Sequence, residues 1–237
     1  MTLENPTRRV ELLTKDGRLP PMARKRTYGD RCGIARALDV VGERWALLVA
    51  RELLLGPKRF TDLRAGLPGL SPDVLSQRLR ELEQAGLVRR RKLAPPAGSR
   101  VYELTERGLA LEPILVELGR WGSQTPVPEG EAAFSADSFV IALRALFDPG
   151  AAEGVDVTVE LRLGEDGFRS RVADGWLEVA RGSAERPDAV VESAPATLAA
   201  VLWHGRPLAD ALRTGDVEIE GSTPAVKRFL GVFPAAA

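Results

Sequence analysis

The sequence is poor in the residues that build disulfide, metal and redox sites. Its 237 residues include one cysteine, Cys32, and one histidine, His204. A single cysteine excludes an intrachain disulfide, and this pair leaves too few ligands for a soft-metal site. The chain also lacks a P-loop, a dinucleotide-binding fingerprint and any spacing typical of metal ligands. We therefore expect neither an enzyme nor a protein that carries a cofactor or a metal.

Long apolar runs are also missing. No run approaches the roughly 18–20 residues that a helix needs to span a bilayer. The first residues, MTLENPTRRVELLTKDGRLPP, lack the apolar core of a secretory signal. We expect a cytoplasmic protein with no membrane partner. We also predict that residues 1–22 are either a disordered extension or lie upstream of a native start at Met22.

The formal net charge is zero, but the two signs are separated along the chain. Residues 1–125 hold 23 Lys and Arg against 15 Asp and Glu, whereas residues 126–237 hold 10 against 18. The stretch GSQTPVPEGEAAF between the two parts has no apolar period and reads as a linker. We predict two domains, at 23–122 and 134–237, joined by a linker at 123–133. The basic first domain is a candidate for binding a polyanion.

Apolar periods and helix-ending residues give the first domain a definite order of elements. The pattern predicts helices at 34–41, 43–55, 60–65, 71–85 and 106–121, and strands at 87–93 and 100–104. Helices followed by a two-stranded hairpin and a last helix form a winged helix-turn-helix. This order of elements, together with the excess of basic residues, points to DNA.

The fourth of these helices has a polar face that suits the reading of bases. Three leucines form one stripe, and short hydrogen-bonding side chains with one arginine lie opposite. Gln pairs with adenine, Arg with guanine, and Ser with either base or phosphate. An ordinary solvated face is the alternative, but the run of arginines in the following hairpin favours DNA. The predicted DNA contacts are Ser71, Asp73, Ser76, Gln77, Arg80, Arg89, Arg91 and Arg100, with Lys58 and Arg59 as phosphate contacts.

The motifs of this domain resemble the HxlR-type winged-helix regulators, a group of bacterial-type regulators. The matching stretches are ALDVVGERW, LLLGPKRFTDL, LSQRLRELEQAGLV and YELTERG, within about residues 23–122. The resemblance implies a homodimer, joined through the first and last helices, that binds a pseudo-palindromic operator in double-stranded DNA. Cys32 matches a cysteine that some members use to sense quinones, aldehydes or oxidants. Cys32 is therefore a candidate thiol sensor, the alternative being a small structural cysteine.

The second half of the chain predicts the other part of an α+β protein. Residues 155–163 alternate between apolar and polar, which is typical of a half-buried strand. Further strands are predicted at 168–172, 176–180, 189–193 and 216–220, with helices at 134–147, 195–203, 207–213 and 222–232. We expect an antiparallel sheet of about five strands with helices on one side.

This half resembles the sterol carrier protein type-two-like domain over about residues 131–237. The resemblance is carried by DVTVELRLGEDGFRSRVADGWLEVARGSAERPDAVVES and LAAVLWHGRPLADALRTGDVEIEGSTPAVKRFLGVF. It implies an apolar tunnel for an acyl or sterol-like ligand, although each lining residue would serve equally well in an ordinary core. The candidate lining residues are Phe139, Leu143, Leu146, Leu198, Leu202, Trp203, Leu208, Leu212, Phe229 and Phe233.

Taken together, the sequence predicts a dimeric DNA-binding transcriptional regulator, expected to be a repressor, that responds to an apolar small molecule in its second domain. The alternative is a lipid or acyl carrier, or an accessory enzyme subunit, whose winged helix makes protein contacts only. DNA binding at low salt distinguishes the two.

Overall fold

The computed structural model describes residues 27–94, 98–125 and 134–234. The described elements fall into two compact units, with the boundary between Val40 and Val41. The first unit contains most of α1 (Gly33–Val41), and the second contains every later element. Within the first unit, the Thr27 hydroxyl and the Tyr28 amide both donate to the Asp39 carboxylate, at 2.9 Å each. The predicted extension at 1–22 and most of the predicted linker at 123–133 lie outside the described residues.

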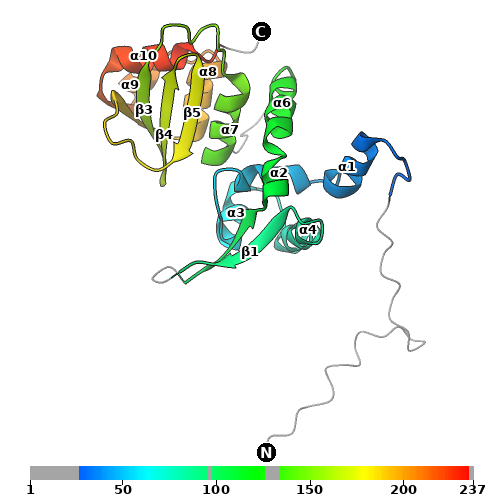
Figure 1. The fold of residues 1–237 in the computed structure, drawn as a ribbon. Coiled ribbons are helices and arrows are strands. Elements are labelled where there is room, and N and C mark those ends of the chain that lie inside the picture. The colour runs from blue at the N-terminus through cyan, green and yellow to red at the C-terminus, as the bar shows by residue number, and fades with distance from the viewer. Residues whose placement is uncertain (1–26, 95–97, 126–133, 235–237) are drawn as a thin grey trace, which may run out of the picture. The chain divides into compact units, whose positions relative to one another are not determined.

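The second unit begins with the elements of a winged helix, and their order is the predicted one (Figure 1). They are α2 (Ala46–Leu53), α3 (Phe60–Gly66), α4 (Pro72–Gln84), β1 (Val88–Lys92), β2 (Arg100–Leu104), α5 (Glu106–Leu109) and α6 (Glu112–Gly122).

Two of the predicted helices have different bounds. The helix expected at 43–55 begins only at Ala46, because Trp45 has a left-handed backbone with φ of 78°. The helix expected at 106–121 is divided into α5 and α6. Pro113 lies in the first turn of α6, where its missing N–H costs nothing, whereas an uninterrupted helix would lose a hydrogen bond there.

Helix α4 forms as its sequence predicts. The Ser71 hydroxyl accepts a hydrogen bond from the Val74 amide at 3.3 Å, and Pro72 follows at the first helical position. Gly86, with φ of 70°, turns the chain away after the last turn. The three leucines of the stripe, Leu75, Leu79 and Leu82, are fully buried. Their burial fixes which face of α4 is left for solvent or DNA.

The rest of the second unit is an α+β region with a five-stranded sheet. Its helices are α7 (Ala136–Leu146), α8 (Pro195–Trp203), α9 (Leu208–Arg213) and α10 (Thr223–Gly231), and its strands are β3 (Val157–Leu163), β4 (Asp166–Ala173), β5 (Trp176–Arg181), β6 (Ala189–Ser193) and β7 (Val217–Gly221). The strand order is β5-β4-β3-β6-β7. The sheet is mixed, because the chain crosses from the edge strand β5 to pair β6 parallel with β3 while the other pairings are antiparallel.

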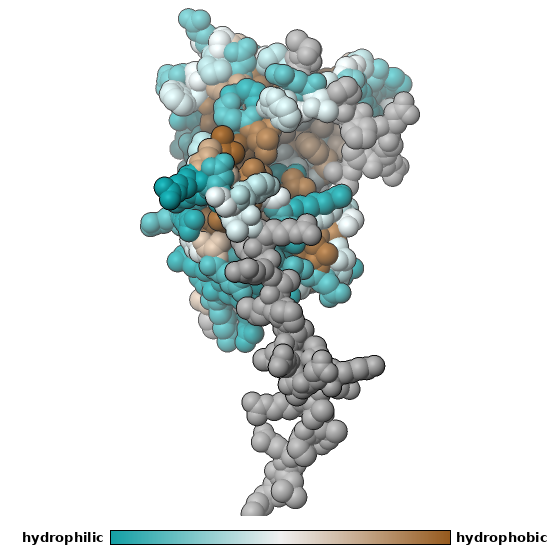
Figure 2. Space-filling view, turned by 90° about the vertical axis from the view of Figure 1, so that its right-hand side faces the viewer, coloured by the Kyte–Doolittle hydropathy of each residue, from teal (hydrophilic) through white to brown (hydrophobic). Residues whose placement is uncertain are grey.

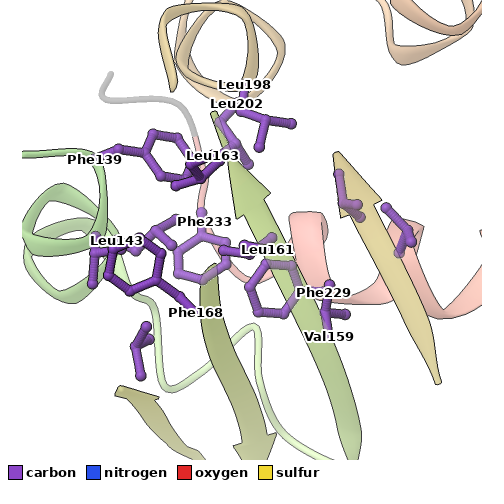
Figure 3. Packing of buried hydrophobic residues seen from close by; sticks show 14 of the residues in the cluster. Phe139, Leu143, Val159, Leu161, Leu163, Phe168, Leu198, Leu202, Phe229 and Phe233 are labelled. Atoms are coloured by element: carbon purple, nitrogen blue, oxygen red, sulfur yellow. The ribbon is translucent and has the colours of Figure 1, made fainter. Parts of the chain in front are cut away.

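The core of this region lies between one face of the sheet and the helices. Buried and exposed residues alternate along β4, and α10 packs against β3 and β6. Aromatic rings meet in this layer, with 5.2 Å between the ring centroids of Phe229 and Phe233 (Figure 3). The core takes up most of the predicted ligand-lining residues: Phe139, Leu143, Leu198, Leu202, Phe229 and Phe233 belong to it, and Trp203, Leu208 and Leu212 pack against it.

Candidate nucleic-acid interface

The solvent face of α4 presents the predicted base-reading side chains. Asp73, Gln77 and Arg80 are exposed, and Ser76 is half-buried. The Gln77 amide donates to the Glu81 carboxylate at 3.1 Å, one turn along the same helix. Arg80 makes no ion pair or hydrogen bond with any residue that the structure describes. The Ser71 hydroxyl is already engaged as the helix cap, so its role in the structure is to start α4.

The hairpin places its arginines on alternate faces, as the geometry of a strand requires. Arg89 and Arg91 both bond the carboxylate of Glu103 on β2, at 2.7 and 2.8 Å. Arg90 points the other way, bonds Glu83 at 2.8 Å and lies over the Tyr102 ring. Glu103 therefore holds two half-exposed guanidinium groups side by side on one face of the wing. Both guanidinium groups are therefore held in place before any phosphate binds. The Glu103 carboxylate offsets part of their combined positive charge.

Arg100 and Arg59 are also exposed, and the structure leaves both guanidinium groups at the surface of the winged helix. Arg100 stands opposite Lys92 in the hairpin register. Opposing cations repel each other, so a phosphate beside this pair would be attracted by both. Arg59 immediately precedes α3.

We expect Arg100→Ala to reduce the magnitude of the slope of log affinity against log salt by about 1, because each neutralised phosphate contributes that amount. Fluorescence anisotropy with labelled duplex DNA at several salt concentrations measures the slope. Arg213→Ala is the matched control, since Arg213 is an exposed arginine of α9 in the other region. An unchanged slope for Arg100→Ala removes this residue from the interface.

Lys58 is engaged inside the protein, so its predicted phosphate contact stays a prediction that this structure does not favour. Its ammonium group is held between two carboxylates, bonding Glu52 at 2.7 Å and also Asp137. Only 12% of the side chain is exposed. The sequence offered no sign of this burial, because both partners become neighbours only through the tertiary fold.

Lys58 belongs to a chain of alternating charges that we call the junction network. Its members are Arg51, Glu52, Lys58, Asp137, Arg181 and Asp166. Glu52 and Asp137 are fully buried, and Glu52 also accepts from the Ser135 hydroxyl at 2.8 Å. Each buried carboxylate bonds two cations, and Glu52 also has a hydroxyl partner, which is the condition under which buried charges are tolerated.

Arg181 shows how strongly the network holds its charges. Burial alone would lower the pKa of its guanidinium group, but the charges and hydrogen bonds of Asp137 and then Asp166 outweigh burial and raise the pKa. The guanidinium group also lies 4.8 Å from the centroid of the Phe168 ring. Arg181 therefore stays a cation between its two carboxylate partners.

The network reaches the wing through the backbone of Lys58. The Lys58 amide donates to the Tyr102 carbonyl at 3.0 Å, and the Tyr102 amide donates back at 2.8 Å. Asp137, on α7, thus bonds the side chain of Lys58, and the backbone of Lys58 pairs with Tyr102 of the wing strand β2. Sequence reasoning missed Glu52 and Asp137, although Glu52 lies one turn from Val49 and next to Leu53 on the buried side of α2.

A second buried arginine was also missed. Arg78, on the leucine side of α4, bonds Glu81 and lies 3.6 Å from Glu43. It joins α4 to the segment before α2, so it positions the reading helix without facing solvent. The helical period could have predicted this burial, because Arg78 lies three residues after Leu75 on the buried stripe of α4.

The remaining sequence candidates have simple surroundings. Cys32 is exposed just before α1, and its amide donates to the Asp30 carboxylate at 2.9 Å. A role as a thiol sensor stays a prediction. His204 is the C-cap residue of α8. In the part of the chain that the structure describes, no group of three or more His, Cys, Asp or Glu is arranged to hold a metal ion, and no helix is long and apolar enough to cross a membrane.

The family model for HxlR-like helix-turn-helix proteins matches residues 40–129. The uncharacterized HTH-type transcriptional regulator YvaP of Bacillus subtilis is 43% identical over 90 residues, which are 38% of this chain and 82% of that protein. The chain belongs to the HxlR-like helix-turn-helix family. The HTH-type transcriptional regulator YodB of the same species is 38% identical over 88 residues, covering 37% of this chain and 79% of YodB. A solved structure of the reduced form of YodB covers 43% of this chain and all of that chain, at 34% identity and a TM-score of 0.37.

Outside the HxlR-like part, the family model for the alkyl sulfatase C-terminal region matches residues 130–236. The match does not confirm the predicted sterol carrier resemblance. The relatives named above each cover about two fifths of this chain. The HxlR-like family membership therefore rests on the winged helix.

Proposed function

We propose that the chain is a sequence-specific DNA-binding transcriptional repressor that acts as a homodimer. The observation that carries this proposal is the face of α4, where Gln77 and Arg80 are exposed above a buried leucine stripe. The arginine pair held by Glu103 on the wing supplies a second, phosphate-directed surface in the same unit. In this proposal α4 enters the major groove and the hairpin follows the DNA backbone.

Gel-shift titrations test the proposal with two duplexes of equal length, one from upstream of the protein's own gene and one of random sequence. A regulator binds the first more tightly, and both affinities fall as salt rises. Failure to bind either duplex at low salt overturns the proposal. That outcome favours a carrier or accessory enzyme subunit, an alternative that the packing of the predicted lining residues into the core makes less attractive.

The homodimer is supported by apolar side chains that two helices leave exposed. On α1, Ile34 and Leu38 are exposed at a spacing of four residues. On α6, Ile114, Leu118 and Trp121 are exposed at spacings of four and three, and 69% of Trp121 is accessible. Apolar surface is open to solvent between polar regions on the face shown in Figure 2. Residues at these spacings lie on one side of a helix, which suits a helical partner.

We expect Trp121→Glu to convert the dimer into a monomer, because a carboxylate would be buried at an apolar contact without a partner. Light scattering coupled to size-exclusion chromatography measures the mass. Trp176→Glu is the control: Trp176 is also exposed, but it belongs to β5 and to neither proposed dimer helix. A Trp121→Glu protein that keeps twice the chain mass would show that α6 is not the dimer surface.

A further inference from the structure

A pocket of about 610 Å³ lies where the winged helix meets the α+β region of the same unit. Its walls come from α2, α6, α7 and the end of α8, and we call it the junction pocket. The residues that matter for its chemistry are Leu48, Arg51, Leu118, Ser138, Ala142 and Trp203. Its volume is within the range of sites that take small organic molecules. Of the predicted ligand-lining residues, Leu146 and Trp203 line it.

The walls combine apolar surface with donors that lack acceptors. Leu48, Leu118 and Ala142 supply aliphatic surface. The Nε1 atom of Trp203 and the Nε atom of Arg51 are buried and have no hydrogen-bond partner. Buried N–H groups are normally satisfied, so two unpaired donors in residues of one pocket are unusual. Both atoms are themselves closed off from solvent, so a ligand in the pocket would meet the accessible part of the Arg51 guanidinium group. The Trp203 ring itself is held by Phe139, 5.6 Å away between centroids, and so presents a fixed surface.

We propose that the junction pocket binds a small apolar molecule that carries a carboxylate, with the carboxylate at Arg51 and the apolar body between α6 and α7. The guanidinium group of Arg51 gives the carboxylate a charged donor beside apolar walls. The role of this ligand as an effector rests on the proposed function. Its binding to the pocket does not depend on that function.

The pocket adjoins the junction network at two points. Arg51 donates to Glu52 at 3.0 Å, and the Ser138 hydroxyl shares a hydrogen bond with Ser135, which donates to Glu52. Glu52 holds Lys58, whose backbone pairs with the wing at Tyr102. A ligand carboxylate that competes with Glu52 for Arg51 therefore alters the charges around Lys58. A ligand that binds better to one arrangement of this network than to the other shifts the wing between them.

The test uses dodecanoate and the fluorescent dye anilinonaphthalene sulfonate on the full-length chain. Both probes have an apolar body and an anionic head. We expect saturable dye fluorescence at one site per chain, and displacement of the dye by dodecanoate. Ala142→Trp, which fills the pocket from α7, should weaken the binding of both probes at least about tenfold, a loss of about 1.4 kcal/mol. Ala151→Trp is the matched control, because Ala151 is exposed and does not line the pocket.

A second variant keeps the test decisive if Ala142→Trp does not fold. Gly122 lines the pocket and a Cβ there would meet nothing within 4 Å, so Gly122→Phe adds bulk without strain. Arg51→Gln should weaken dodecanoate more than dodecanol, because only the carboxylate uses the positive charge. Equal losses for acid and alcohol, or unchanged binding in both filled variants, overturn the proposed site.

Three outcomes separate this inference from the proposed function. DNA binding without any dye binding overturns the pocket and leaves the regulator intact. Dye binding that weakens as the protein concentration rises means that a second copy of the chain covers the pocket, which also overturns it. Dye binding that Ala142→Trp abolishes, in a protein that binds no DNA, supports the pocket while the regulator fails.

Discussion

Asp137→Ala is expected to lower the free energy of unfolding by about 3 to 5 kcal/mol, the cost of removing one partner from a buried ion pair. Asp137 is 1% exposed and bonds both Lys58 and Arg181. Without it, Lys58 keeps only Glu52 and Arg181 keeps only the half-exposed Asp166, so each cation loses one of its two carboxylate partners. Urea denaturation followed by circular dichroism measures the effect.

Asp166→Ala is the matched control for this prediction. Asp166 bonds the same arginine, but 44% of its side chain is exposed, so its loss should cost at most about 1 kcal/mol. Adding Lys58→Met to Asp137→Ala removes one of the two cations that Asp137 had bonded. The double variant should therefore be less destabilised than the sum of the two single variants. A loss below about 1 kcal/mol for Asp137→Ala would show that its charge is solvated and not part of a buried network.

The local elements of this fold are legible in the sequence because their signals are local. Ser71 and Pro72 start α4, its leucines face inward at the helical period, and Gly86 ends it. The alternation of the hairpin arginines follows from the geometry of a strand. The polar face of α4 was therefore predictable residue by residue.

The junction network was not predictable, because its partners are far apart in the chain. Lys58 reaches across 79 residues to Asp137, and Arg181 reaches back 44 residues to the same carboxylate. Gly66 shows the same dependence on tertiary structure. A Cβ at Gly66 would lie 2.3 Å from the Glu52 carboxylate, so any other residue here would force the Glu52 side chain to shift. The residues around Gly66 in the sequence do not predict its close approach to Glu52.

The mixed pairing of the sheet was also not predictable from local sequence, because it too depends on tertiary structure. The strands were found from their alternation, but alternation does not tell which strand lies beside which. The parallel pairing of β3 with β6 depends on where the chain returns after β5, and the short connection between β5 and β6 carries no pattern that gives this position. The predicted lining residues show the same limit: spacing identified them as apolar and inward-facing, and the tertiary structure shows that most of them pack in one core.

Arg80→Ala and Gln77→Ala are expected to weaken binding to a specific operator by about 1 to 3 kcal/mol each, the usual value of a bidentate base contact. Arg80 has no partner among the described residues, so its guanidinium group is free to bind a guanine edge. Gln77 must release Glu81, but an exposed pair one helical turn apart contributes only about 0.2–0.5 kcal/mol. Anisotropy titrations with operator and random duplexes measure both affinities.

The difference between the two duplexes decides what α4 does. Removing a side chain that reads bases weakens binding to the operator and has little effect on binding to random DNA. Removing a side chain that binds phosphate weakens binding to both duplexes equally. Gln84→Ala is the matched control, since Gln84 is an exposed glutamine at the far end of the same helix. The N-terminal half of a recognition helix lies nearest the bases, so Gln84 should tolerate the change. Equal losses on both duplexes for Gln77 and Arg80 would place α4 on the DNA backbone and leave base reading to another element.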